Sequence, residues 1–156
     1  MTKKKSEPTN QKKKVVIDRA TWMTGRYDKS DSAGPTYLLN GKGMMCCLGF
    51  ALNQVCGVPK MDLRSKAMPR HVTVEKDLEP FASTSSCTFS CNSWREGRQR
   101  IRCDSDLTVA ASTINDDADL TDAEREAKLV KLFAKDDIEL SFTGRYPSRK
   151  ASFPRK

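Results

Sequence analysis

Residues 40–59 read NGKGMMCCLGFALNQVCGVP. From about Cys47 onward, apolar residues recur at the spacing of a buried helix. These residues are Leu48, Ala51, Leu52 and Val55. Gly57 is placed to cap the helix, and Pro59 lies just beyond it. Gly49 lies inside the helix and weakens it by roughly 1 kcal/mol relative to alanine. We therefore expect Gly49 to pack closely against another backbone segment.

The residues before this helix predict strands and a loop. VVIDRATW at 15–22 begins with β-branched residues, which favour a strand. Residues 24–35 are rich in Gly, Asp, Ser and Pro and predict a loop. TYLLN at 36–40 predicts a second strand. Asn40-Gly41 predicts a hairpin turn, with MMCC as the partner strand.

The C-terminal third carries the clearest helix signal. Thr121 and Glu124 form a T-x-x-E capping box, so a helix is expected from about Asp122. We also expect this helix to have an apolar face. Its members would be Ala123, Ala127, Leu129, Val130, Leu132, Phe133 and Ala134. Residues 138–142, IELSF, then alternate as a half-buried strand does.

The middle of the chain is harder to assign. HVTVE at 71–75 predicts a short strand, residues 82–93 a polar loop or edge strand, and RQRIRC at 98–103 a strand. Residues 106–113 fit a strand or a short helix. Helices and strands are interspersed without a repeated strand–helix unit. This pattern predicts a single compact α+β domain over residues 15–144, with a small, mostly antiparallel sheet and two main helices.

The net charge of +8 is concentrated at the two ends of the chain. Residues 1–14 carry six lysines and one glutamate, and residues 145–156 carry five basic residues and no acid, so each end has a charge of +5. Residues 15–144 therefore have a net charge of −2. Both ends are too polar to bury much apolar surface, so we expect disordered basic tails. No segment has the character of a signal peptide or membrane span, which predicts a soluble cytoplasmic protein.

Three blocks of sequence resemble those of a known group of proteins. The blocks are Thr21-Trp22-x-x-Gly25, then Met45-Cys46-Cys47-Leu48-Gly49-Phe50 with Cys56-Gly57, then Ile114-Asn115-Asp116-Asp117 leading to Glu124-Arg125-Glu126. Together they are similar to blocks in small uncharacterised proteins encoded by bacteriophages and bacterial genomes. The resemblance implies a bacterial host cytoplasm as the setting. It implies no activity and no cofactor.

The chain has six cysteines, which we expect to be free thiols because no export signal precedes them. Cys47 would lie at a helix N-terminus, where the helix dipole lowers a thiol pKa. This segment resembles the cysteine-bearing helix of cell-wall-cleaving cysteine peptidases. A cysteine-dependent hydrolase would need His71, the only histidine, as its base. The preferred interpretation is that the thiols pack in the core, because cysteine is among the most buried residue types.

Two metal sites are conceivable. Cys87, Cys91 and Cys103, with His71, are candidate zinc ligands, although only one pair has suitable spacing. A set of oxygen ligands follows the spacing of a calcium-binding EF-hand loop. These residues are Asn115, Asp117, Asp119 and Glu126. Leu120 occupies the position where such a loop needs glycine, so a solvated acidic loop is the preferred interpretation.

An aromatic residue beside a row of arginines suggests a binding surface. Trp94 precedes Arg95, Arg98, Arg100 and Arg102, and such residues stack on bases, contact phosphates or anchor protein interfaces. Lysines of the N-terminal tail would add electrostatic attraction. These are Lys3, Lys4, Lys5, Lys12, Lys13 and Lys14.

The sequence thus favours a small non-enzymatic, phage-encoded binding protein. Its partner would be a host or phage protein complex or a nucleic acid, with no cofactor, membrane or small-molecule substrate. A cysteine-dependent hydrolase and a zinc-stabilised nucleic-acid-binding module are the alternatives.

Overall fold

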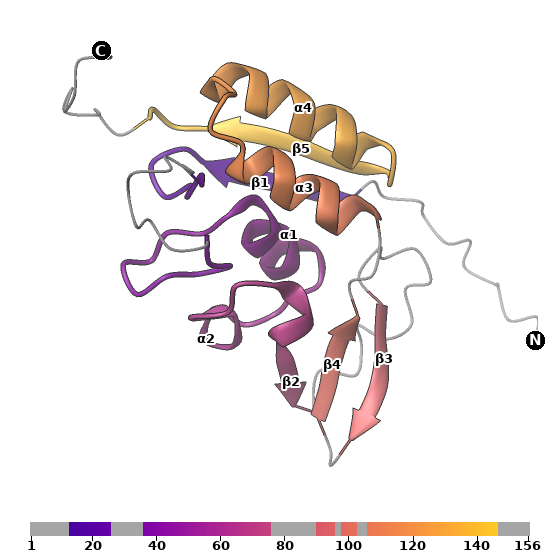
Figure 1. Ribbon diagram of the computed structural model, residues 1–156. Coiled ribbons are helices and arrows are strands. Elements are labelled where there is room, and N and C mark those ends of the chain that lie inside the picture. Colours follow the sequence, from indigo (N-terminus) through magenta and orange to yellow (C-terminus); the bar gives the residue numbers. More distant parts are fainter. Residues whose placement is uncertain (1–12, 26–35, 76–89, 96–97, 103–105, 147–156) are drawn as a thin grey trace, which may run out of the picture.

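The computed structural model describes residues 13–25, 36–75, 90–95, 98–102 and 106–146, and it has an α+β fold (Figure 1). Its α-helices are α1 (Cys47–Val55), α2 (Lys60–Leu63), α3 (Asp106–Asp116) and α4 (Asp122–Ala134), with a 3₁₀ turn, η1 (Pro69–His71). Its strands are β1 (Lys13–Asp18), β2 (Thr73–Glu75), β3 (Ser90–Arg95), β4 (Arg98–Arg102) and β5 (Ile138–Thr143). In the described part of the chain, no helix has the length and apolar character needed to cross a membrane.

The core sheet is parallel, which corrects the expectation of a mostly antiparallel sheet. β1 pairs with β5 from Lys13↔Ile138 to Asp18↔Thr143. The strands are far apart in sequence, and parallel strands require a long crossover. Here the helices between them provide it. Val15 on β1 is buried and Val16 is exposed, so one face of the sheet meets the core.

The boundaries of β1 also differ from the prediction. Lys13 and Lys14, expected in a disordered tail, are the first two residues of the strand. The strand ends at Asp18 and does not continue to Trp22, because the chain turns there. The carboxylate of Asp18 accepts from the Ala20 N–H at 3.0 Å, and its carbonyl accepts from the Thr21 N–H at 3.1 Å.

Helix α1 lies in the centre of the core, as its apolar pattern predicts. Residues 47–52 are all buried, and Gly57 has a φ of 66° just after the C-cap. A Cβ built on Gly49 would lie 2.0 Å from the carbonyl oxygen of Leu38. The expected close packing of Gly49 against another backbone is therefore confirmed.

The predicted strand at 36–40 and its hairpin are absent. The Asn40 turn does form, because the Asn40 side chain accepts from the N–H groups of Lys42 and Met44, both at 2.9 Å. Across the turn, the Asn40 N–H donates to the Met44 carbonyl at 2.9 Å and the Cys46 N–H donates to the Tyr37 carbonyl at 3.3 Å, but no regular hairpin follows. Leu39 bridges to Arg64, and Met45 bridges to Trp22.

The C-terminal helix and strand form as predicted, with a different buried face on the helix. The capping box between Thr121 and Glu124 is present. The buried residues of α4 are Arg125, Leu129 and Phe133. The expected apolar face was wrong in part, because several of its members are exposed. These are Ala123, Ala127, Val130 and Ala134. Residues 106–113, left open above, belong to α3.

A second, antiparallel sheet lies apart from the core sheet (Figure 1). Its strand order is β2-β4-β3. β4 is central, and η1 packs against it. The short strand expected at 71–75, the edge strand within 82–93 and the strand at 98–103 are thus found as β2, β3 and β4.

Candidate functional site

Asn115, near the end of α3, joins three segments that are distant in sequence. Its Oδ1 accepts from the indole N–H of Trp22 at 2.9 Å and from the backbone N–H of Cys47 at 3.3 Å. Its Nδ2 donates to the Met23 carbonyl at 3.2 Å. Asn115 is 1% exposed, so its side chain is a buried polar group with partners for both its oxygen and its nitrogen.

Asp116 extends this junction towards the solvent. Its carboxylate accepts from the Thr36 hydroxyl at 2.7 Å and from Asn115 Nδ2 at 2.8 Å. The backbone at Gly25 passes so close that an added Cβ would lie 2.6 Å from Asp116 Oδ1. The three blocks noted in the sequence, around Trp22, Cys47 and Asn115, therefore meet in space.

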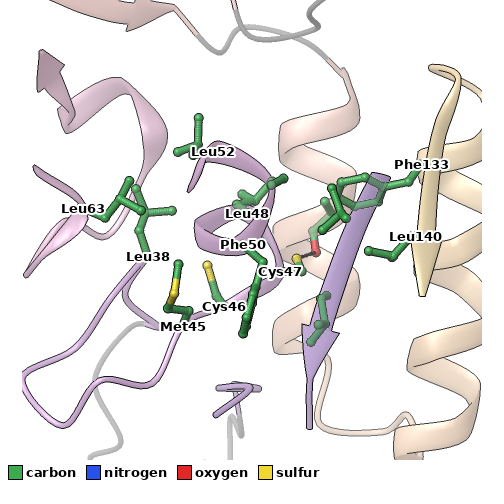
Figure 2. Close-up of a cluster of buried hydrophobic side chains, with 14 of the residues drawn as sticks. Leu38, Met45, Cys46, Cys47, Leu48, Phe50, Leu52, Leu63, Phe133 and Leu140 are labelled. Carbon is green, nitrogen blue, oxygen red and sulfur yellow. Dashed lines mark hydrogen bonds between the residues drawn. The ribbon is translucent and has the colours of Figure 1, made fainter. Parts of the chain in front are cut away.

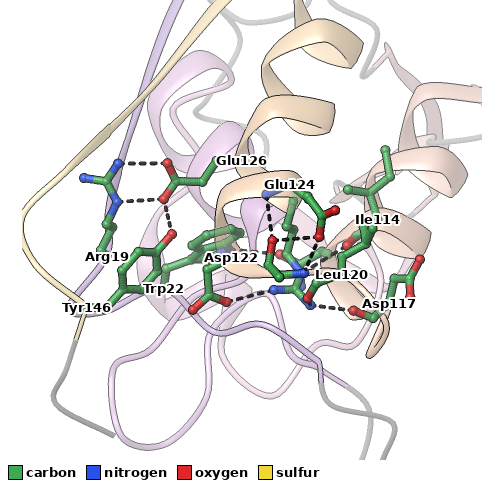
Figure 3. A network of polar contacts seen from close by, with 12 residues as sticks. Arg19, Trp22, Ile114, Asp117, Leu120, Asp122, Glu124, Glu126 and Tyr146 are labelled. Carbon is green, nitrogen blue, oxygen red and sulfur yellow. Dashed lines mark hydrogen bonds and ion pairs between the residues drawn. The ribbon is translucent and has the colours of Figure 1, made fainter.

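Arg125 stabilises the loop between α3 and α4, and its partners Ile114, Asp117 and Leu120 are labelled in Figure 3. It is 3% exposed, and its guanidinium donates to the carbonyls of Ile114 at 3.2 Å and Leu120 at 3.2 Å and to that of Asp117. It also forms an ion pair with Asp122 at 2.9 Å. These contacts satisfy a buried charge, one carbonyl in the last turn of α3 and two carbonyls of the loop that follows it.

A second polar cluster attaches the end of the described chain to β1 and α4 (Figure 3). Arg19 binds Glu126 in a bidentate ion pair, with distances of 2.6 and 2.8 Å, and the Tyr146 hydroxyl also donates to Glu126. Burial opposes ionisation of Glu126, but the hydrogen bonds from Arg19 and Tyr146 outweigh it and lower its pKa. Burial, followed by the hydrogen bond to Glu126, raises the pKa of Tyr146 to about 12. Neither Arg19 nor Tyr146 carried a sequence signal for this contact.

These contacts exclude the calcium loop considered above. Asn115 Oδ1 and both carboxylate oxygens of Glu126 are already occupied by protein donors. Across the described residues, no group of three or more His, Cys, Asp or Glu side chains is arranged to hold a metal ion. Of the zinc candidates, Cys87 and Cys103 lie outside the described residues, and Cys91 is placed opposite Ile101 in the β3–β4 ladder.

A pocket of about 740 Å³ lies beside the Asn115 junction. Its wall includes the start of α1, residues 112–113 and 115–119, Thr36 and Met68. Asn115 and Asp116 bond as described, and Asp117 Oδ1 accepts from the Asp119 N–H at 2.9 Å. Since these polar groups are engaged within the protein, the pocket is not assigned a ligand.

Cys46 and Cys47, at the start of α1, are core residues (Figure 2). Cys46, Cys47 and Cys56 are all buried, and Cys46 and Cys47 are free thiols. Burial raises the pKa of Cys46 to about 11, and it raises the pKa of Cys47 well above the usual value. The Cys47 thiol donates to the Ala111 carbonyl, with a sulfur–oxygen distance of 3.7 Å, and His71 lies exposed in η1. A thiol with this pKa is a poor nucleophile at neutral pH, so the geometry does not support the hydrolase alternative.

We predict that the buried thiols react slowly in the native protein. With a thiol-selective reagent at neutral pH, Cys46 and Cys47 should become modified only on unfolding, since both are buried and their thiolates are disfavoured. Mass spectrometry of digested protein locates each modified residue. His71→Ala should leave the rate at Cys47 unchanged. Fast labelling of native Cys47 that slows in this variant would instead support a catalytic pair.

Arg95, Arg98, Arg100 and Arg102 lie on strands β3 and β4 of the antiparallel sheet. The register of these strands places Trp94 at a different position from the arginines. Arg95 is directly opposite Arg98, which is also opposite Glu75 on β2. Arg100 and Arg102 follow at alternate positions of β4, so these arginines share one face of the sheet. Trp94 is opposite Gln99 and therefore lies on the other face.

The tail lysines Lys3, Lys4, Lys5 and Lys12 lie outside the described residues, while Lys14 on β1 pairs with Glu139 at 3.5 Å.

Comparison with known proteins identifies no relative of this chain. No family model matches the chain, and no match is found among curated proteins or solved structures.

Proposed function

We propose that this chain is a non-enzymatic binding protein, encoded by a phage or its bacterial host, whose partner is a nucleic acid. The binding surface is the arginine face, defined here as the side of the antiparallel sheet that carries Arg95, Arg98, Arg100 and Arg102. The observation that carries the proposal is the register of β4 against β3 and β2. A host protein complex with an acidic surface is the competing partner.

The register brings several arginines together in the antiparallel sheet, with too few acidic residues in its strands to balance their charge. Arg95 and Arg98 are direct cross-strand neighbours, and like charges in that position destabilise a sheet. Glu75 is the only acidic residue of the β2–β4–β3 ladder among the described residues. A polyanion placed on this face would neutralise the arginines, and phosphate groups suit guanidinium because they accept two hydrogen bonds in its planar geometry. The lysines near the N-terminus would add nonspecific attraction.

We expect binding to depend on the arginine face and to weaken with salt. The triple substitution Arg98→Gln, Arg100→Gln and Arg102→Gln should lower affinity for a short duplex DNA about 100-fold at low salt. It should also reduce the slope of log K against log salt by about 2.7, if each arginine contacts one phosphate. Fluorescence anisotropy over a salt series with labelled DNA measures both quantities.

The matched control removes the same charge elsewhere. Lys42, Lys60 and Lys128 are exposed and lie outside the antiparallel sheet, and their replacement by glutamine should change affinity only a few-fold. Equal losses in both triple variants would show that net charge alone drives binding. If the wild-type protein binds neither duplex nor single-stranded DNA nor RNA, the nucleic-acid proposal is wrong.

A further inference from the structure

Hydroxyl residues lie beside the arginines on the arginine face. Residues that are directly opposite one another on neighbouring strands share a face of the sheet. Arg100 is opposite Thr73 on β2 and Ser93 on β3, and Arg102 is opposite Ser90. Serine and threonine hydroxyls donate to phosphate oxygens, as arginine does. This face therefore carries two kinds of residue that suit a phosphate backbone.

The other face of the same sheet is mostly apolar, and it holds the aromatic residue. Gln99 on that face is opposite Val74 and Trp94, and Ile101 is opposite Cys91. An antiparallel sheet that alternates in this way commonly packs its apolar face and exposes its polar face to solvent. The sheet lies at the opposite end of the molecule from α4 and β5 (Figure 1). The arginine face is thus the side that a nucleic acid can reach.

The lack of an aromatic residue on the arginine face distinguishes between single and double strands. Proteins that bind single strands stack the bases on aromatic side chains beside a basic groove. Among the paired residues that the structure describes, the arginine face has no aromatic residue on which a base could stack. In a duplex the bases already stack on one another, so binding needs only contacts to the phosphates.

Charge density favours the duplex as well. Arg98, Arg100 and Arg102 extend over about 13 Å of β4, since alternate residues of a strand are about 6.6 Å apart. Over that length a duplex carries about eight phosphate charges and a single strand about four. The row of arginines therefore meets about twice the charge on a duplex.

We propose, on the basis of the nucleic-acid function above, that the arginine face binds double-stranded nucleic acid in preference to single strands. The three arginines of β4 bind phosphates of the duplex, and the neighbouring hydroxyl residues donate to the same backbone. A single strand has the lower charge density and leaves its unstacked bases without an aromatic partner on this face.

Fluorescence anisotropy of the full chain with two labelled probes tests this preference. One probe is a short single-stranded DNA without self-complementarity, and the other is the same strand annealed to its complement. At one fixed low salt concentration, wild-type protein should bind the duplex at least about tenfold more tightly. The triple substitution Arg98→Gln, Arg100→Gln and Arg102→Gln should remove most of this ratio, because it weakens duplex binding more than single-strand binding.

Ser93→Tyr supplies the missing aromatic residue beside Arg100. It should raise the affinity for the single strand about tenfold, because a base can then stack on the ring, and it should change duplex affinity only a few-fold. Ser141→Tyr is the matched control. It makes the same change at an exposed position of β5, outside the antiparallel sheet, and should leave both affinities unchanged.

The possible failures are distinguishable. Wild-type protein that binds the single strand as tightly as the duplex overturns this preference and leaves the proposed function intact. So does a duplex preference that the triple variant retains, since the preference then arises outside the arginine face. A folded Ser93→Tyr protein with unchanged single-strand affinity also contradicts the proposal. If neither probe nor RNA binds, the proposed function is wrong as well. Circular dichroism establishes that each variant is folded, and the two probes with wild-type and triple-variant protein remain decisive if Ser93→Tyr is not folded.

Discussion

Gly49→Ala is expected to destabilise the protein by about 3 kcal/mol, a loss typical of overpacking in a core that cannot relax. The new methyl group would lie 2.0 Å from the Leu38 carbonyl oxygen and 2.8 Å from the carbonyl carbon. Both are backbone atoms, so no side-chain rotation relieves the overlap. Helix propensity alone predicts the opposite sign, because alanine is favoured over glycine by about 1 kcal/mol inside a helix. The sign of the change in the free energy of unfolding therefore shows whether close packing or helix propensity dominates at Gly49.

Urea denaturation of both proteins measures the change in the free energy of unfolding. Gly41→Ala is the matched control, since an added Cβ there meets no atom within 4 Å. Its effect should stay within about 0.5 kcal/mol, as for most surface substitutions. A Gly49→Ala protein as stable as wild type would mean that α1 moves freely away from Leu38.

The elements that were predictable from sequence are those whose signals are local. The capping box at Thr121 marks the start of α4, and the alternating residues 138–142 mark β5. The helix at Cys47 was also predictable, because its apolar residues, its interior Gly49 and its capping Gly57 agree. Each signal lies within a few residues of the element that it specifies.

Pairings between distant segments were not predictable in the same way. Nothing within residues 13–18 or 138–143 specifies a parallel partner, because direction depends on the path of the chain between them. Residues 36–40 include strand-forming residues, yet Leu39 within them bridges to Arg64, while Met45 after the turn bridges to Trp22. Strand propensity describes a residue's fit to a pleated surface and does not choose its partner.

The buried face of α4 was predicted wrongly in part, because the prediction relied on which residues are apolar. Alanine is small enough to tolerate either exposure or burial, so Ala123 and Ala127 carried little information about orientation. Arg125 took an inward position because the carbonyl of Ile114 in α3 and those of Asp117 and Leu120 after it satisfy its guanidinium. Hydrophobic periodicity does not predict the burial of an arginine that has such partners.

The candidate site was predictable only as separate pieces. The blocks around Trp22, Cys47 and Asn115 were recognised in the sequence, but Asn115 was considered as a metal ligand in an exposed acidic loop. The structure instead buries it between the other two blocks. Its role depends on contacts across 93 and 68 residues of chain, which no local pattern encodes.

Asn115→Ala should therefore cost about 3 to 4 kcal/mol, among the largest effects of any side-chain truncation in this fold. The substitution leaves the Trp22 indole N–H and the Cys47 N–H without their acceptor, and each unsatisfied buried group costs about 1 to 3 kcal/mol. A small cavity beside α1 adds to the loss. Thermal or urea unfolding of the single variant measures the total.

A double-mutant cycle with Trp22→Phe isolates the buried hydrogen bond. Trp22→Phe alone removes the indole donor and leaves Asn115 Oδ1 with the Cys47 N–H. If the contact at 2.9 Å contributes as the geometry indicates, the double variant should be more stable than the sum of the two single losses predicts, by about 1 kcal/mol or more. Strict additivity would mean that Trp22 and Asn115 act independently. The blocks around Trp22, Cys47 and Asn115 would then be neighbours held by apolar packing alone, and not by the amide that now connects them.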